Sequence, residues 1–339
     1  MIDRKSEIDA ERIAKRIARA GLCSRREAEQ WILAGRVEVN SKKIASPALD
    51  VRAADRILVD GKSLPERDRT RLFLYHKPRG LVTSARDPQG RPTIFGHLPP
   101  HLPRLVSVGR LDLNTEGLLL LTNDGGLARV LDLPTPGWLR RSRVRAHGRV
   151  SQGALEALAK GITVDGIRYG PIEARLDREQ GSNVWLTFAM REGKNREIRN
   201  VLGALGLQVN RLIRISFGPF RLGELPEGAV EEVRTRVLRE QISERIAQEA
   251  GADFSAPVLQ HAPNTSPLAG QVDRPKAGRE GGTAREPQTE KIRRGTLTDR
   301  KGRRVSVERV ESTKQERPSK HRPHRYHGRS AGSRKSRRP

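Results

Sequence analysis

Cysteine is almost absent from this chain of 339 residues, whose single thiol, Cys23, rules out an internal disulfide. Cys23 stands in a helical context, and we interpret it as a small packing residue. The eight histidines show no spacing with cysteine that is typical of zinc sites, and three of them belong to an arginine-rich stretch, His321, His324 and His327. We therefore expect no metal.

Long apolar runs are also missing, and neither a signal peptide nor a lipidation motif is present. Acidic residues are in the minority, since 66 Lys+Arg oppose 40 Asp+Glu and the formal net charge is +26. Such an excess predicts a polyanionic partner, either nucleic acid or an anionic membrane surface. Without a membrane-directed segment, nucleic acid is favoured, and we expect a soluble, cytoplasmic, monomeric protein.

Residues 10–62 have the pattern of a compact α/β module. Apolar positions at helical spacing run from Glu11 to Ala20, and a capping box from Ser24 to Glu27 opens a second helix. Strand-like segments follow, with a polar turn predicted at residues 41–43. Taken singly, each basic residue of this module is better interpreted as a solvated charge. As a cluster, five of them would contact RNA phosphates: Arg25, Arg26, Arg36, Lys42 and Lys43.

The middle of the chain predicts a larger domain. Residues 63–70 are polar and charged, as in a linker. Over residues 71–250 strand-like segments alternate with turns, and helical stretches are few, chiefly 154–160 and 197–205, before a charged helix from about 231 to 250. This pattern indicates an α+β domain with a mostly antiparallel sheet.

Composition changes after residue 250. Residues 255–339 hold 22 Lys+Arg, 8 Asp+Glu and one aromatic residue, Tyr326, and so carry +14 of the net charge of +26. Because this stretch has too little apolar surface for a core, we predict that residues 251–339 form a disordered basic tail that binds RNA by charge. The alternative is a tail that serves only solubility.

The most specific feature is the run Gly-Arg-Leu-Asp-Leu-Asn-Thr-Glu-Gly from Gly109 to Gly117, which leads into four leucines. It places Asp112 in a polar loop before a segment suited to a buried strand. The alternative interpretation is that Asp112 only caps a turn. After the leucines, Asn123-Asp124-Gly125 is interpreted as the closing turn of a hairpin.

The run around Asp112 resembles the motif of the RsuA/RluB/RluE/RluF family of ribosomal RNA pseudouridine synthases, in which the aspartate of Gly-Arg-Leu-Asp is catalytic. In the N-terminal module, Ala20–Glu29 and Gly35–Asn40 resemble the RNA-binding module of ribosomal protein S4. The resemblance covers about residues 10–235. It implies an S4-like module, a pseudouridine synthase domain and the isomerisation of uridine without a cofactor, a reaction that needs a carboxylate balanced by a cation.

The resemblance also implies roles for residues elsewhere in the chain. Glu192–Arg199 resembles the third motif of the family, in which Arg199 pairs with the catalytic aspartate and Ile198 lines the uracil pocket. Lys194 and Arg196 would face RNA phosphates or form a basic helix face. Arg110 would fill the stack that the extruded uridine vacates.

Two further segments complete the comparison with the family. Tyr75–Gly80 resembles its Lys-Pro-x-Gly segment at the entrance of the catalytic domain, which we interpret as structural, with Lys77 as a candidate phosphate contact. The family's second motif has a tyrosine that stacks on the target base, whereas this chain has Ser142 at the matching position. Stacking of a base on an aromatic ring contributes on the order of 1–3 kcal/mol, so its loss slows the reaction unless another aromatic residue compensates.

The sequence thus predicts a site-specific ribosomal RNA pseudouridine synthase. Within the family, the long basic extension is more like the large-subunit enzymes, which favours 23S over 16S rRNA, either naked or in a ribosomal particle. The alternative is a non-catalytic rRNA-binding or ribosome-assembly factor with a degraded active site, which Ser142 favours and which Asp112 and Arg199 disfavour.

Overall fold

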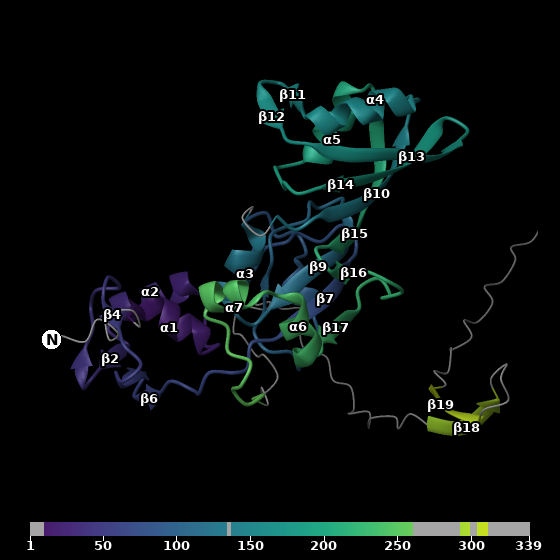
Figure 1. Cartoon of the computed structure of the whole chain (residues 1–339). Helices are drawn as coiled ribbons and strands as arrows, with labels where there is room; N and C mark the ends of the chain where they lie inside the picture. The colour runs from purple at the N-terminus through teal and green to yellow at the C-terminus, as the bar shows by residue number, and fades with distance from the viewer. Residues whose placement is uncertain (1–9, 134–136, 260–291, 299–303, 311–339) are drawn as a thin grey trace, which may run out of the picture. The chain divides into compact units, whose positions relative to one another are not determined.

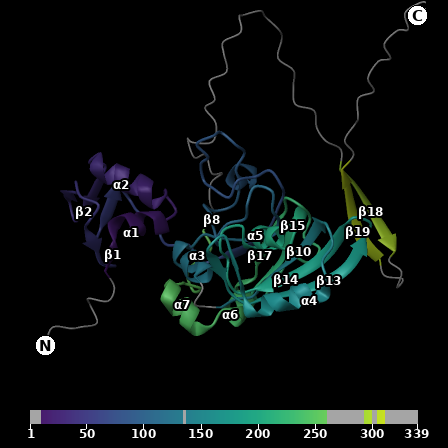
Figure 2. The ribbon, with the colours of Figure 1, turned by 90° about the horizontal axis from the view of Figure 1, so that it is seen from above.

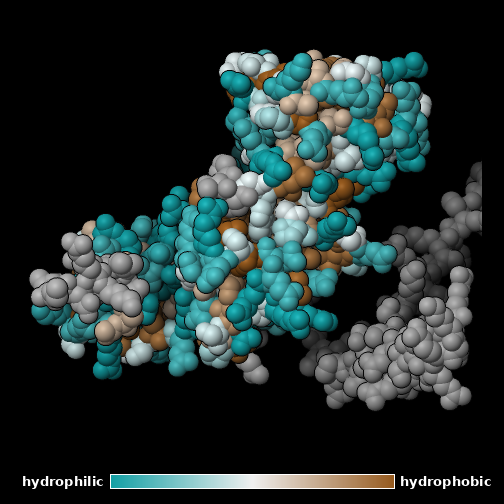
Figure 3. Space-filling model, viewed as in Figure 1, coloured by the Kyte–Doolittle hydropathy of each residue, from teal (hydrophilic) through white to brown (hydrophobic). Residues whose placement is uncertain are grey.

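The structure, a computed structural model, describes residues 10–133, 137–259, 292–298 and 304–310 (Figure 1). It divides into two compact units, residues 1–271 and 272–339, and each is considered by itself. The first unit contains the N-terminal module and the sheet domain. Hydrophilic side chains cover most of the face of this unit that Figure 3 shows.

Two helices, a four-stranded sheet and a separate two-stranded sheet form the N-terminal module, whose helices followed by short strands agree with the sequence. The capping box is confirmed, because the Ser24 hydroxyl accepts from the backbone of Glu27 while the Glu27 carboxylate accepts from the Ser24 backbone. Cys23 is buried in the module core, which confirms its packing role. The elements are β1 (Glu11–Arg12), α1 (Ile13–Arg19), α2 (Arg25–Leu33), β2 (Val37–Val39), β3 (Lys42–Lys43), β4 (Asp50–Val51), β5 (Ile57–Val59) and β6 (Lys62–Ser63).

The predicted polar turn is shifted in the structure. Lys42 and Lys43 form strand β3, which pairs with β2. The turn instead lies at Asn40 and Ser41, whose φ angles are 49° and 66°. Asparagine tolerates this left-handed conformation better than most residues, which explains why the chain reverses one residue earlier than predicted.

A nine-stranded sheet forms the second domain, in the order β13-β14-β10-β15-β9-β7-β17, with β16 on β15 and β8 on β9 (Figure 1). Figure 2 shows β13, β14, β10 and β15 of this sheet from above. Every pair is antiparallel except β15 with β9, which confirms a mostly antiparallel sheet. The strands are β7 (Leu72–Lys77), β8 (Val106–Ser107), β9 (Glu116–Thr122), β10 (Arg140–His147), β13 (Ile172–Gln180), β14 (Asn183–Met190), β15 (Gln208–Phe217), β16 (Phe220–Arg221) and β17 (Val230–Val233).

Strand β9 lies in the centre of the sheet, and all seven of its residues are buried. Leu118 and Leu120 pack in the core that contains α3 (Gly125–Asp132), whereas Leu119 and Leu121 pack in a separate core with Leu111 and Ile94. Because both faces of β9 are packed, the strand is held firmly in the sheet, and it begins directly after the loop that carries Asp112.

The remaining elements cover the ends of the sheet. The helices α4 (Gln152–Glu156) and α5 (Glu197–Ala204) pack on β10 and β14, and a short hairpin joins β11 (Ile162–Val164) to β12 (Ile167–Tyr169). The single charged helix predicted at 231–250 is wrong. Residues 230–233 form β17, and two short helices follow, α6 (Thr235–Gln241) and α7 (Glu244–Ala250), the second capped by Ser243.

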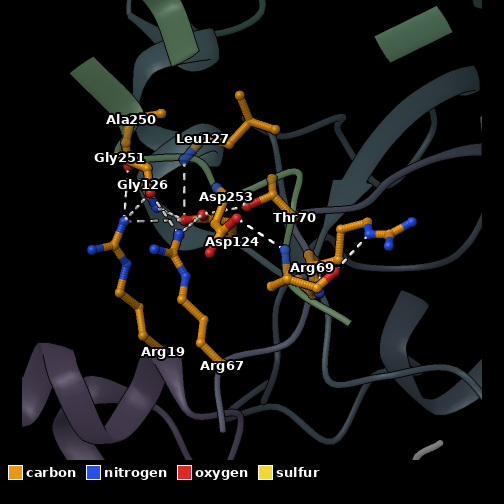
Figure 4. A network of polar contacts seen from close by, with 12 residues as sticks. Arg19, Arg67, Arg69, Thr70, Asp124, Gly126, Leu127, Ala250, Gly251 and Asp253 are labelled. Carbon is orange, nitrogen blue, oxygen red and sulfur yellow. Dashed lines mark hydrogen bonds and ion pairs between the residues drawn. The ribbon is translucent and has the colours of Figure 1, made fainter. Parts of the chain in front are cut away.

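The hairpin turn predicted at Asn123-Asp124-Gly125 is also wrong, because Asp124 is the N-cap of α3 (Figure 4). Its Oδ1 accepts from the backbone of Gly126 at 2.8 Å, and its Oδ2 accepts from Arg67 at 2.8 Å and from Thr70 at 2.9 Å. Arg19 of α1 lies 3.7 Å from the same carboxylate. Asp124, which is 4% exposed, therefore links α3 to the linker and to the N-terminal module.

The boundary of the predicted tail at residue 251 is wrong as well. Residues 251–259 pack against the linker 63–70, since Thr70 donates its amide to Asp253 at 2.7 Å and Arg69 donates to Pro257 at 3.0 Å. In the second unit, the described residues form an antiparallel hairpin of β18 (Ile292–Thr298) and β19 (Arg304–Val310). His321, His324 and His327 lie outside the described residues.

Candidate active site

Asp112 lies in the loop between β8 and β9, and the backbone of this loop is held on several sides. Thr83 donates its hydroxyl to the Leu111 carbonyl at 2.8 Å, and the Gly80 amide donates to the Leu113 carbonyl at 2.8 Å. The Thr115 amide donates to the Asp112 carbonyl at 3.0 Å, closing a turn. The Asp112 carboxylate itself stays 34% exposed, so it is fixed in position and open to a substrate.

Lys77 is fully buried beneath this loop, which corrects its prediction as a phosphate contact. Its ammonium donates to the carbonyls of Pro78 at 2.9 Å and Thr115 at 3.0 Å, and more weakly to that of Leu113 at 3.4 Å. Burial lowers the Lys77 pKa to about 8, although the nearby Asp112 and Glu116 carboxylates oppose the shift. Lys77 therefore holds the loop that presents Asp112 and cannot reach RNA.

The cation that approaches Asp112 is Arg196, whose Nη1 lies 3.8 Å from Oδ2. Arg199, the predicted partner, instead donates to the Asn114 carbonyl at 3.1 Å and to the Val209 carbonyl at 3.3 Å. The Arg199 pKa is lowered by burial and by the neighbouring Arg196 and Arg79, while Asp112 raises it. In the structure Arg196, and not Arg199, lies within ion-pair distance of Asp112, and both arginines belong to the same motif at the start of α5.

Arg196 reaches Asp112 because of the backbone at the start of α5. It is the N-cap of the helix and adopts a left-handed conformation with φ of 52°. Next to it, Ile198 is 8% exposed and packs in the core of α4 and α5. Lys194, predicted to face RNA, is exposed but pairs with Glu192 at 2.9 Å.

A second buried carboxylate, Glu116, lies at the start of β9. It is 2% exposed and accepts from Arg211 of β15 at 2.7 Å, with Arg79 at 3.7 Å. The sequence alone indicated no separate role for Glu116. Its position four residues after Asp112 in a polar stretch, directly before the apolar run, was the available signal. Glu116 joins β9 to β15 at the edge of the Asp112 loop.

Ser142 lies in β10, opposite Phe188 on β14 and Arg214 on β15, and is 7% exposed. Two aromatic residues that could have compensated for the missing tyrosine are engaged elsewhere. Trp138 packs edge-on against Phe217 with ring centroids 5.9 Å apart. The hydroxyl of buried Tyr169 accepts from Asn200 at 2.9 Å.

The predicted RNA contacts of the N-terminal module lie on its surface. Arg25 and Arg26 are exposed in the first turn of α2, and Lys42 and Lys43 are exposed on β3. Arg36 is exposed but forms a two-pronged ion pair with Asp60, at 2.9 and 2.5 Å. Away from the module, Arg110 is exposed beside the Asp112 loop.

Comparisons with known proteins show the family of this chain. The model of the S4 domain family matches residues 11–57, and the RNA pseudouridylate synthase family matches residues 71–136. An uncharacterized RNA pseudouridine synthase of Rickettsia felis is 45% identical over 228 residues, which are 67% of this chain and 99% of the relative. This chain belongs to the RNA pseudouridine synthases.

Other relatives agree with the resemblance to the RsuA/RluB family. The ribosomal large subunit pseudouridine synthase B of Pseudomonas aeruginosa is 38% identical over 298 residues, covering 84% of this chain and 76% of that protein. A crystal structure of a pseudouridylate synthase is 28% identical, with a TM-score of 0.48, over 68% of this chain and 99% of the other. The two family matches and the Rickettsia felis relative show that the synthase is an isomerase with an S4 domain, as the sequence predicted. Among its described helices, none is long and apolar enough to cross a membrane.

Proposed function

We propose that this synthase isomerises a specific uridine of ribosomal RNA, in the cytoplasm, and that the uridine belongs to 23S rRNA. The relatives called ribosomal large subunit pseudouridine synthase B support the choice of rRNA. The basic composition of residues 255–339 favours the large subunit. The proposed monomeric enzyme uses no organic cofactor, because the isomerisation involves no net oxidation or hydrolysis.

The proposal is carried by one observation, the contact of the Asp112 loop with the start of α5. There Arg196 lies 3.8 Å from the Asp112 carboxylate, and Arg199 donates to the Asn114 carbonyl at 3.1 Å. Asp112 is assigned as the carboxylate that acts at the sugar or base. The bond between C1′ and N1 of uridine breaks, a bond between C1′ and C5 forms, C5 loses a proton and N1 gains one. Arg196 and Arg199 stabilise the carboxylate and its loop, and Ile198 borders the space for the uracil ring.

Extrusion of the target uridine leaves a gap in the RNA stack. Arg110 is assigned to fill it, because its exposed guanidinium is two residues from Asp112 and is planar. The exposed residues Arg25, Arg26, Lys42 and Lys43 supply phosphate contacts from the S4 module, which add affinity without reading sequence.

The proposal is tested by mapping pseudouridines in 23S and 16S rRNA from cells with and without the gene. We expect one 23S uridine to remain unmodified in the deletion strain and to regain modification when the gene is restored. A loss in 16S rRNA would overturn the large-subunit assignment. An unchanged map in all rRNA would overturn the rRNA substrate.

A second candidate function, a non-catalytic rRNA-binding or assembly factor, is favoured by one observation. Ser142 occupies the position of the expected tyrosine and offers no stacking surface. Complementation of the deletion strain with an Asp112→Asn gene separates the two candidates. A binding factor would restore ribosome assembly with this variant as well as with the wild-type gene, and neither gene would modify a uridine. If the protein is the enzyme, the wild-type gene restores the modification and the variant leaves the target uridine unmodified.

A further inference from the structure

Arginines alternate along one face of the sheet, apart from the residues assigned above. On β10, Val144 and Ala146 are fully buried and pack in the core that contains Ile198 of α5. Because side chains of a strand alternate between its two faces, the β10 residues that alternate with Ser142, Val144 and Ala146 point away from that core. These residues are Arg141, Arg143 and Arg145.

Trp185 of β14 lies among these arginines. The backbone register places it opposite Arg145 on β10 and Arg178 on β13. The guanidinium carbon of Arg143 is 5.0 Å from the centroid of the indole ring, and that of Arg178 is 5.7 Å away. Both distances are within the range of cation–π interaction. Trp185 is only partly buried, and the guanidinium groups of Arg143 and Arg178 lie over its indole ring.

Arginines outnumber carboxylates on this face. Asp177 pairs with Arg175 at 3.1 Å and lies 3.8 Å from Arg143. Within the described part of the chain, the buried Nε of Arg145 has no hydrogen-bond partner, and no ion pair involves Arg178. We name this surface the Trp185 face and define it by five residues, Arg143, Arg145, Arg175, Arg178 and Trp185.

We propose that the Trp185 face binds the substrate RNA outside the target uridine. An unpaired base stacks on the indole of Trp185, and Arg143 and Arg178 contact its base plane or adjacent phosphates. Other proteins bind single-stranded RNA with this combination of a cationic surface and an aromatic ring. In some of them the rings are displayed on the open face of a sheet. The indole supplies stacking without sequence readout, since every base has a π-face.

The chemistry of the surface favours RNA over other occupants. A partner protein would need a larger apolar centre than one indole ring surrounded by guanidinium groups. The inference rests on RNA as the substrate, which the family shows, and is independent of which rRNA is modified. Its location on β10, β13 and β14 also separates it from the phosphate contacts proposed for the S4 module.

The experiment measures binding of full-length protein to a labelled 12-nucleotide oligouridine, together with turnover on total rRNA from cells that lack the gene. We expect Trp185→Ala to weaken oligouridine binding about tenfold and to raise KM with little change in kcat. Trp185→Phe, which keeps a ring, retains most of the affinity. The pair Arg143→Gln and Arg178→Gln lowers the slope of log affinity against log salt by about 1.4, or about 0.7 for each phosphate that the protein no longer neutralises.

The matched control removes two exposed arginines from α6, Arg236→Gln and Arg239→Gln. We expect these changes to leave KM and the salt slope as in the wild type. The proposal is overturned if the control pair weakens binding as much as the pair on the Trp185 face. It is also overturned if Trp185→Ala and the face pair, both unfolding cooperatively, bind oligouridine like the wild type. Binding is measured without turnover, so a wrong rRNA assignment cannot produce either result.

Discussion

Arg196 and Asp112 approach each other to 3.8 Å across the junction between α5 and the loop before β9. Both side chains remain substantially exposed, at 54% and 34%. The neighbouring Arg199 binds the backbone of the same loop through the Asn114 carbonyl. Arg196 therefore approaches the carboxylate, and Arg199 holds the loop that carries it.

This division predicts unequal effects of the two arginines. Arg196→Gln removes an exposed ion pair, which contributes about 0–1 kcal/mol, so we expect kcat/KM to fall at most about fivefold, and less at high salt. Arg199→Gln leaves the Asn114 and Val209 carbonyls without their donor, and such losses cost about 1–3 kcal/mol. We expect its kcat to fall roughly ten- to a hundredfold in single-turnover assays of pseudouridine formation. A larger loss for Arg196→Gln than for Arg199→Gln would contradict the division.

Asp112→Asn should abolish pseudouridine formation, because the amide has the same shape but cannot serve as nucleophile or base. RNA affinity should stay within about twofold, since Asp112 contributes no positive charge to phosphate binding. Turnover and filter binding on the same rRNA preparation check both statements. Retained turnover by the purified variant would show that another group performs the chemistry.

Ser142→Tyr should raise turnover, because a ring at this position regains stacking on the target base, worth on the order of 1–3 kcal/mol. Ser142→Ala is the matched control, and we expect it to change turnover less than about threefold. The position is only 7% exposed, so urea unfolding of both variants must accompany the assay to detect overpacking. Lower turnover by a stably folded Ser142→Tyr protein would show that serine is required there.

Lys77 makes stability depend on alkaline pH. Burial lowers its pKa in the folded protein to about 8 from an ordinary value of 10.5, so between these values the unfolded chain binds the additional proton. The free energy of unfolding contributed by this group therefore rises with pH from about 8 to 10.5, and below pH 8 the cost of the buried charge is constant.

We expect Lys77→Met to lack this increase, so that the wild type gains stability relative to the variant as pH rises. Urea unfolding at pH 7.5, 9 and 10 measures the difference, with exposed Lys160→Met as the control for general alkaline effects. Turnover of Lys77→Met should also fall, because the Pro78 and Thr115 carbonyls lose their donor. Parallel pH profiles of the wild type and Lys77→Met would contradict the assignment.

Truncation should distinguish the packed segment from the chain beyond it. Removal of residues 260–339 should leave cooperative unfolding unchanged, weaken rRNA binding and reduce its salt dependence, because this region carries most of the excess basic charge. Removal of residues 251–339 should in addition lower the free energy of unfolding by about 2 kcal/mol, since Thr70 loses Asp253 and the core loses Phe254. Equal stability of the two truncated proteins would show that 251–259 contributes nothing to the fold.

Local patterns in the sequence determined much of this protein. The capping box at Ser24 and Glu27 defines the start of α2. The four leucines after Gly117 form a short apolar run that favours a buried strand, and in the structure they belong to β9. The motif from Gly109 to Gly117 singled out Asp112 as the candidate carboxylate, because a motif is recognised from its residue types and spacing alone. The helical pattern at 197–205 likewise predicted the start of α5.

Only the tertiary structure decided which groups meet. Lys77 reads as a surface cation in the sequence, yet three loop carbonyls surround its ammonium in the core. The sequence around Asp124 indicates a turn, but in the structure Asp124 is the N-cap of α3, and its carboxylate accepts from Arg67 and Thr70 of the linker. The choice of Arg196 over Arg199 for Asp112 depends on one left-handed residue at the start of α5. Composition and spacing specify local backbone preferences and the burial of apolar residues, whereas the burial and the partner of a charged side chain depend on long-range chain packing.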